Sequence, residues 1–194
     1  MRPDEMQEKA GTPKITVVSN TGPLISALQC GRMDLLQQYF SVVYITASEV
    51  RELHQHGWQN EIQQFIEEGF IIVVEELSEA EQKAAEQIAR DIAARLTSGD
   101  PDWQNHLPEA EAMALMQQRT SLAIDQILLD EKAAREVAQE LGLRVTGFPG
   151  VLGRAGLDGL LTQDEIRQLL KTCQRQGTHY SDTLIETVAQ TYGR

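Results

Sequence analysis

The stretch Ile15–Ile25, ITVVSNTGPLI, decides the fold of this chain. Its first residues are mostly β-branched and predict a short strand, and the Gly-Pro pair that follows Thr21 predicts the start of a helix. The strand therefore ends just before Asn20. Because ligands and metals in an open α/β sheet are usually met at the carboxyl ends of the strands, Asn20 is the first candidate for a functional residue.

Short apolar runs alternate with helical patterns along the rest of the chain. The run FIIVV, Phe70–Val74, is apolar throughout, which is typical of a strand covered on both faces. The alternation predicts an α/β fold in which helices cover both faces of a parallel sheet. The expected strands cover residues 15–19, 41–46, 70–74, 123–129 and 143–146.

Capping signals mark where several helices begin. A Ser or Thr that is followed three residues later by Glu satisfies two backbone N–H groups at a helix start. Ser48 and Ser181 are expected to cap helices on their own. The two pairs of this kind are Ser78 with Glu81 and Thr162 with Glu165.

The composition is that of a globular protein with one sizeable core. Hydrophobic residues make up 41% of the 194 residues, and no apolar run approaches the length of a membrane span, roughly 20 residues. The polar N-terminus, MRPDEMQEKAGTPK, carries acids and indicates a loose leader, not a secretory signal. Cys30 and Cys173 lack metal-binding spacing, so we expect both to be buried apolar residues in a reducing cytoplasm, with no membrane contact.

The net charge of −12 limits the kinds of partner. The chain has 17 Lys and Arg against 29 Asp and Glu, and non-specific binding of nucleic acid depends on basic residues that neutralise phosphates. A broad basic surface is therefore excluded. Contact with a single phosphate through a metal ion, or binding of a basic partner, stays open.

Acidic residues follow the predicted strands or open the neighbouring helices. Mg²⁺ and Mn²⁺ prefer oxygen ligands, so a cluster of carboxylates suits metal-assisted hydrolysis of phosphodiester bonds. Taken singly, each acid is better explained as part of a solvated helix start, where the helix dipole favours negative charge. Only their joint placement indicates a site. The residues are Glu49, Glu52, Glu109, Glu111, Asp130 and Glu131.

Five stretches resemble, in their order and spacing, a largely uncharacterised bacterial and archaeal branch of the PIN-domain superfamily, which is related to the nuclease toxins of toxin–antitoxin pairs. They are VVSNTGPLI, VYITASEVREL, PEAEAMAL, ILLDEKAAREVAQELGLRVTG and GVLGRAGLDGLL. The resemblance implies a three-layer α/β/α fold with a small parallel sheet, and cleavage of RNA that depends on Mg²⁺ or Mn²⁺. We expect a leader over residues 1–13, a PIN-like domain over 14–161 with a helical insertion at about 76–107, and a helical C-terminal appendage over 162–194.

The resemblance also implies roles for individual residues. Asn20 matches the first metal-binding aspartate of the family. Glu52 matches the acid of the helix after the second strand, and Glu109 matches the acid that opens PEAEAMAL, where the branch usually has glycine in place of Pro108. Asp130 matches the acid that ends the fourth strand. All four are expected metal ligands, and the three carboxylates are the expected catalytic residues.

Four further residues are weaker candidates. Glu111 and Glu131 are secondary, because close neighbours along a helix or strand point in other directions. Lys132 and Arg135 follow the fourth strand and are expected to contact phosphates, although isolated basic residues are more often simply solvated.

Asn20 is the departure from the acidic quartet of the family. Its amide oxygen can coordinate a hard cation but adds no negative charge, and asparagine cannot act as a general base. Asparagine also occurs at this position within the branch. The alternative role for Asn20 is structural, since its side chain can shape the tight turn from strand to helix together with Thr21.

Three functions are compatible with these residues. The first is a toxin-like, metal-dependent ribonuclease that has RNA as substrate and an antitoxin-like protein as partner. The second is a PIN-like scaffold that binds nucleic acid or protein without catalysis, which Asn20 and the acidic charge favour. The third is an acidic protein whose helical tail and 76–107 segment mediate assembly with another protein or with a second copy of the chain.

Overall fold

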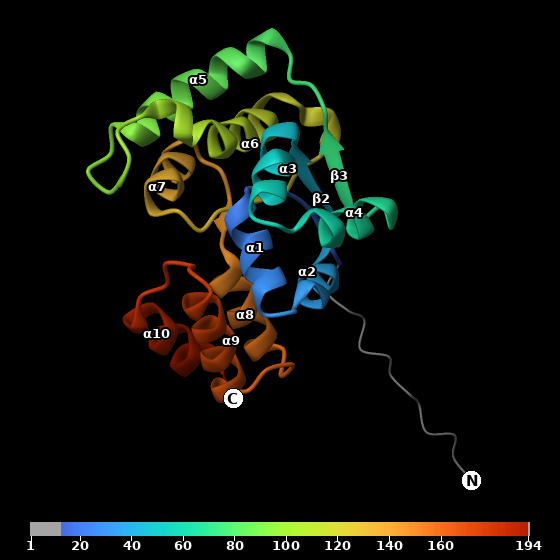
Figure 1. Cartoon of the computed structure of the whole chain (residues 1–194), viewed down its shortest axis with the longest axis vertical. Helices are drawn as coiled ribbons and strands as arrows, with labels where there is room; N and C mark the ends of the chain where they lie inside the picture. Colours follow the sequence, from blue (N-terminus) through green and yellow to red (C-terminus); the bar gives the residue numbers. More distant parts are fainter. Residues whose placement is uncertain (1–12, 194) are drawn as a thin grey trace.

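A five-stranded parallel sheet with the strand order β3-β2-β1-β4-β5 runs through the protein (Figure 1). The computed structural model describes residues 13–193. Strand β1 is central, with β2 on one side and β4 on the other. Along the sequence, β2 and β3 are added on one side of β1, and β4 and β5 on the other. The direction in which strands are added therefore reverses between β1 and β4. The strands are β1 (Ile15–Ser19), β2 (Phe40–Thr46), β3 (Ile71–Val74), β4 (Gln126–Leu128) and β5 (Val145–Thr146).

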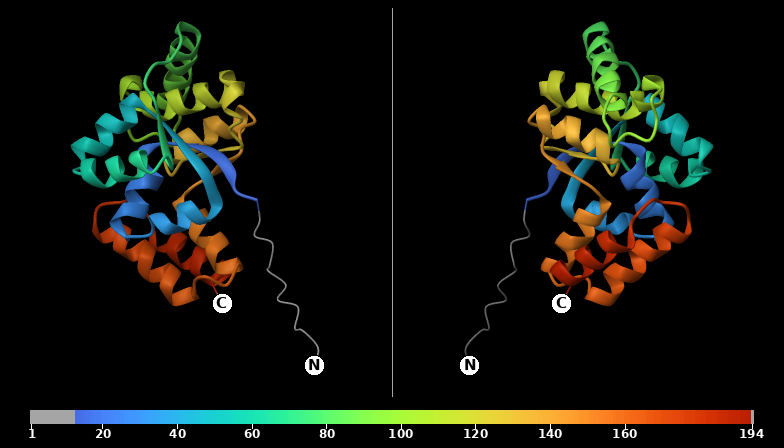
Figure 2. Two further views of the ribbon diagram at one scale, coloured as in Figure 1. Left: turned by 90° about the vertical axis from the view of Figure 1, so that its right-hand side faces the viewer. Right: turned by 90° about the vertical axis from the view of Figure 1, so that its left-hand side faces the viewer.

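Helices cover both faces of the sheet, which confirms the expected three-layer α/β/α fold (Figure 2). Neighbouring side chains of a strand point to opposite faces. Val17 packs among α1–α4 and α8–α10, whereas Val18 packs among α5–α7, and both are fully buried. The helices on the side of Val17 are α1 (Thr21–Gln29), α2 (Met33–Tyr39), α3 (Ala47–Gln55), α4 (Gln59–Glu67), α8 (Phe148–Leu157), α9 (Gln163–Arg175) and α10 (Asp182–Tyr192). Those on the side of Val18 are α5 (Glu79–Ala93), α6 (Leu107–Gln118) and α7 (Lys132–Glu140), with short 3₁₀ turns at Trp103–His106 and Thr120–Leu122.

Most of the expected helix caps are present. Both capping boxes form, at the start of α5 and at the start of α9, and the Ser181 side chain caps α10. The prediction that Ser48 caps a helix is wrong. Strand β2 runs on to Thr46, which takes the N-cap position of α3, and the Ser48 hydroxyl in the first turn donates to Glu111.

Three expected strands differ from the observed ones, and the one expected over 143–146 is reduced to Val145–Thr146. The strand expected over 123–129 is reduced to Gln126–Leu128, because Ala123 adopts a left-handed conformation (φ 47°) and Asp125 bonds to Thr16 through its side chain. Strand β3 lies at an edge of the sheet and leaves Ile72 39% exposed, so one of its faces is not fully covered.

The C-terminal helices share the hydrophobic core of the sheet. Ile166 and Leu170 of α9 and Ile185 of α10 are fully buried in the same cluster as Val17. Helix α9 contacts α1 and α8, and α10 contacts α8. The segment beyond residue 161 is therefore packed on the domain, and the loop between α9 and α10 reaches the carboxyl edge of the sheet.

The two cysteines meet in this layer although they are far apart in the sequence. Cys173 is buried as expected, whereas Cys30 is only partly buried. A hydrogen bond between the two thiols, together with the nearby Arg32, lowers the pKa of Cys30. Across residues 13–193 no helix has the length and hydropathy that crossing a membrane would need.

Candidate functional site at the crossover between β1 and β4

The candidate site lies where the strand order reverses, at the carboxyl ends of β1 and β4. Crevices for ligands form at this point in open α/β sheets, since the connections on its two sides leave toward opposite faces. Asn20 follows β1, and its backbone N–H donates to the carbonyl of Leu128 in β4 at 3.1 Å. Asp130 follows β4. The two predicted residues at strand ends therefore come from neighbouring strands.

Asn20 bonds to the start of its own helix and to Glu109. Its side-chain oxygen accepts from the Gly22 N–H at 3.1 Å and thereby caps α1. Its side-chain nitrogen donates to Glu109 Oε1 at 2.9 Å across 89 residues of sequence. The first bond is the turn-shaping role considered from the sequence. The second places Glu109, in the first turn of α6, directly against the end of β1.

Glu109 lies in an environment that is unfavourable for a charged carboxylate. Its Oε2 is buried and has no hydrogen-bond partner among residues 13–193. Burial, with added repulsion from Glu52 and Glu131, raises the pKa of Glu109 to about 7, and His106 opposes this only in part. A carboxyl with this pKa changes its charge near neutral pH, which is the property of a general acid or base and of a carboxylate that awaits a cation.

Asp130 is held firmly by three neighbours. The Tyr180 hydroxyl donates to Asp130 Oδ2 at 2.6 Å, and the backbone N–H of Phe148 donates to Oδ1 at 2.9 Å. Burial raises the pKa of Asp130 above its usual value, while these two bonds and the charge of Arg135 oppose the rise. Gly147 is required here, because a Cβ on it would lie 2.2 Å from Oδ1.

Glu52 lies on the other side of the β1 end. The hydroxyl of Thr21, the first residue of α1, donates to Glu52 Oε2 at 2.7 Å. About a third of the Glu52 side chain remains exposed (36%), and its charge acts on Glu109. Glu52 is thus oriented by α1 and stays accessible from solvent.

Two more acids lie near Glu109 but face a different element. Glu111 accepts from the hydroxyls of Thr46 and Ser48 at the start of α3. Glu49 is fully buried, and its Oε2 accepts from the Thr46 N–H at 2.6 Å. Burial raises the pKa of Glu49 well above its usual range, and the negative charges of Glu109 and Glu111 raise it further. Glu49 therefore caps α3 beneath the site, and its Oε1, like Glu109 Oε2, is buried without a hydrogen-bond partner among residues 13–193.

The remaining predicted residues lie around the start of α7. Both carboxylate oxygens of Glu131 accept backbone N–H groups of that helix, so its position matches a helix cap. Lys132 is exposed. Arg135 is half-buried, and its Nη1 donates to the Leu129 carbonyl at 2.7 Å beside Asp130.

One side-chain oxygen at the crossover, Oε2 of Glu109, is free to bind a divalent cation. A buried carboxylate oxygen without a partner, beside further carboxylates, favours a hard cation. Asn20 turns its nitrogen toward Glu109, and both oxygens of Asp130 already accept hydrogen bonds. Among residues 13–193, no group of three or more His, Cys, Asp or Glu side chains is arranged to hold a metal. A metal here would rely on one or two carboxylates with water, as Mg²⁺ commonly does.

Sequence reasoning missed Tyr180. It comes from the loop between α9 and α10, is 6% exposed, and bonds to both Asp130 and the Ser26 hydroxyl of α1, the latter at 2.8 Å. The hints in the sequence are its place just before Ser181, which caps α10, and the resemblance of the stretch THYSDTLIETV to the same branch of the PIN-domain superfamily. A tyrosine before a capping serine is too common a pattern to single out.

The protein is thus an α/β domain with a small doubly wound sheet. Its acidic side chains gather at the carboxyl ends of the two central strands. The family described as PIN domain matches residues 16–194. The chain therefore belongs to the PIN-domain family, and the match includes the C-terminal helices and Tyr180. PIN domains are known for nuclease activity and generally use divalent metals. No curated protein matches the chain.

Proposed function

We propose that the protein is a metal-dependent ribonuclease that hydrolyses phosphodiester bonds of RNA. The observation that carries the proposal is Glu109, a buried carboxylate with one unpartnered oxygen and a pKa of about 7 at the crossover of the sheet. A residue that is strongly perturbed by burial and by like charges in a crevice is a candidate for function. Membership in the PIN-domain family supports the same conclusion.

Glu109 and the partly exposed Glu52 would hold a Mg²⁺ or Mn²⁺ ion together with water. Asp130 and the Asn20 side-chain oxygen, which already accept hydrogen bonds, would join as ligands only by exchanging those bonds. When bound, such an ion stabilises charge on the phosphate and lowers the pKa of an attacking water. Each protein group has a separate task. Asn20 fixes the orientation of Glu109 through its amide nitrogen, and Thr21 does the same for Glu52.

One of these carboxyls, Glu109, changes its charge near neutral pH, and another, Asp130, is held in one orientation. The pKa of Glu109 is about 7 in the protein without metal, and a bound cation, which favours the charged carboxylate, would displace its proton. Asp130 is kept in one orientation by Tyr180 and by the start of α8. A fixed carboxylate loses little freedom when it binds, which favours a precisely positioned substrate.

The test is cleavage of a single-stranded RNA with MgCl₂, with MnCl₂ and with EDTA. We expect cleavage only with metal, and loss of cleavage in Glu109→Gln and in Asp130→Asn. Glu86→Gln, which changes an exposed side chain of α5, is the matched control and is expected to cleave normally. Circular dichroism checks that each variant is folded. Unchanged cleavage in both site variants would eliminate the proposal.

One observation favours a second candidate, a PIN-like module that binds nucleic acid or protein without catalysis. The Asn20 nitrogen already satisfies Glu109 Oε1, which lowers the need for a cation there. Titration calorimetry with MnCl₂ separates the two candidates. A one-site isotherm that disappears in Glu109→Gln supports the nuclease, whereas no heat of binding at any concentration, with no hydrolysis, supports the module.

The partners and location belong to the same proposal. A toxin-like nuclease would act on RNA in the cytoplasm and would be controlled by an antitoxin-like protein. The charge of −12 suits a basic partner. Light scattering after size exclusion, with and without co-expressed candidate partners, tests both this pairing and self-association.

A further inference from the structure

A cavity that Asp130 lines and Glu109 does not line opens beside the site. It has a volume of about 290 Å³ and lies between α7, the start of α8 and α10. Asp130 and Tyr180 form one end of it. The catalytic role proposed above uses Asp130 but leaves the cavity itself without a purpose.

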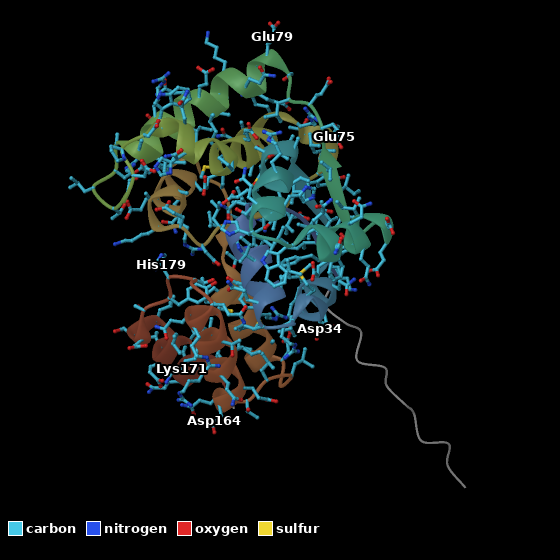
Figure 3. All side chains as sticks on the ribbon, viewed as in Figure 1. Asp34, Glu75, Glu79, Asp164, Lys171 and His179 are labelled. Carbon is cyan, nitrogen blue, oxygen red and sulfur yellow. The ribbon has the colours of Figure 1, made fainter. Side chains whose placement is uncertain are left out.

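The polar side of the cavity carries two groups that bind phosphates. Arg135 of α7 and His179 of the loop before α10 both line it. In Figure 3, His179 stands at the end of that loop which faces α7. Arg135 uses one nitrogen for the Leu129 carbonyl, and its other N–H groups bond to none of residues 13–193. Guanidinium groups are common contacts of phosphates in nucleic-acid complexes, and an imidazole can donate a further hydrogen bond to a phosphate oxygen.

The single acid of the cavity does not oppose an anion strongly. Both oxygens of Asp130 already accept hydrogen bonds, from Tyr180 and from the Phe148 N–H, and Arg135 lies close enough to offset its charge. The cavity is a local exception in a chain with a net charge of −12. In it, Arg135 and His179 lie around a single carboxylate whose oxygens already accept hydrogen bonds.

The opposite wall is apolar and partly aromatic. Leu184, Val188 and Tyr192 of α10 line it. The Tyr192 ring packs against Gly153 of α8, where a Cβ would lie 2.8 Å from the ring, and the residue remains 37% exposed. A fixed and partly exposed ring beside apolar side chains is a platform on which a base can stack.

We propose that this cavity holds one nucleotide of a single-stranded RNA, the one adjoining the cleaved bond, with its phosphate on Arg135 and His179 and its base against Tyr192. The size of the cavity suits one nucleotide, at the lower end of the range for small-molecule sites. This inference rests on the proposed nuclease function, because it makes the cavity part of the path of the substrate.

The test measures binding in EDTA, so that it is independent of metal and of cleavage. The probes are adenosine 5′-monophosphate, adenosine, inorganic phosphate and a pentanucleotide of adenylate, titrated against the full chain by NMR. We expect saturable binding of the monophosphate with a Kd on the order of 1 mM or tighter, weaker binding of adenosine and of phosphate, and tighter binding of the pentanucleotide. Signals of Leu184 and Tyr192 should shift.

The decisive variant is His179→Ala, because His179 is exposed and bonds to no other side chain among the described residues. It should weaken binding of the monophosphate about tenfold, and Arg135→Gln should do the same. His54→Ala, on the exposed side of α3, is the matched control and should leave binding unchanged.

The outcomes separate this inference from the proposed function. Equal binding by the wild type and by His179→Ala overturns the assignment, and so does equal binding of phosphate and of the monophosphate. Tighter binding of the monophosphate than of the pentanucleotide would indicate a site for free nucleotides and would also overturn it. RNA cleavage without any binding in EDTA contradicts the cavity assignment alone, whereas nucleotide binding without cleavage contradicts the nuclease alone.

Discussion

Replacement of Glu109 by Gln should change how the stability of the protein depends on pH. The ordinary pKa of a glutamate is 4.5, and the folded protein raises the pKa of Glu109 to about 7. The folded state therefore binds this proton more tightly than the unfolded state does. Its contribution to stability is complete below about pH 4.5 and is lost as the pH rises through 7.

The magnitude follows from the two pKa values. At roughly 1.4 kcal/mol for each pKa unit, the full effect is about 3 kcal/mol, most of which falls between pH 5 and pH 8. In the Gln variant this contribution is absent. The new amide nitrogen sits where Oε2 has no partner, and it costs the same free energy at both pH values. The comparison between the two pH values therefore isolates the ionisation of Glu109.

The assay is urea unfolding of the wild type and the variant at pH 5 and at pH 8 in EDTA. Between these pH values the wild type should lose about 2–3 kcal/mol more than the variant, which for a chain of this size corresponds to roughly 5–10 °C in Tm. Glu49 and Asp130 also have raised pKa values, but they are present in both proteins and largely cancel. Equal pH dependence in the two proteins would refute the reasoning.

Three further changes test the site. Tyr180→Phe removes the donor to Asp130 and should cost about 1–3 kcal/mol in urea unfolding and shift the pH profile of cleavage, because Asp130 loses a bond that favours its charged form. Asn20→Asp keeps the helix cap but sets a second carboxylate against Glu109. It should lower stability in EDTA and tighten Mn²⁺ binding in calorimetry. Gly147→Ala places a methyl group 2.2 Å from Asp130 Oδ1 and should cost about 1–3 kcal/mol and reduce cleavage.

Each of these variants has a control or a contrary result. Tyr39→Phe removes another bond from a tyrosine to an aspartate, far from the site, and should leave cleavage and its pH profile unchanged. Gly99→Ala adds a methyl group in open space and should change stability by less than about 0.5 kcal/mol. Weaker Mn²⁺ binding in Asn20→Asp would argue against a metal at this carboxylate pair.

Local features of the fold could be predicted because they depend on residues close together in the chain. The box formed by Ser78 and Glu81 needs only a hydroxyl and a carboxylate three residues apart, and it forms as expected. The end of β1 before Asn20 follows in the same way from a β-branched run and a Gly-Pro pair. Where boundaries moved, as at Thr46 and Ala123, pairing in the sheet and side-chain bonds to distant residues decided the outcome.

The candidate site could be predicted only in part. The alternation of strands and helices, with the family resemblance, placed Asn20 and Asp130 at strand ends, and the fold brings those ends together. The bond between Asn20 and Glu109 spans 89 residues, and the bond between Tyr180 and Asp130 spans 50. No local pattern carries such information, because it depends on how α6 and the loop after α9 pack.

The sequence by itself determined the class of fold, the starts of α1, α5, α9 and α10, and the acids that could form a site, because hydrophobic periodicity and capping act over a few residues. Only the tertiary structure decided that Asn20 caps α1 and faces Glu109 with its nitrogen, that Glu109 is buried with a raised pKa, and that Tyr180 holds Asp130. These properties arise from burial and from contacts between distant segments. Such contacts exist only once the helices have packed on the sheet.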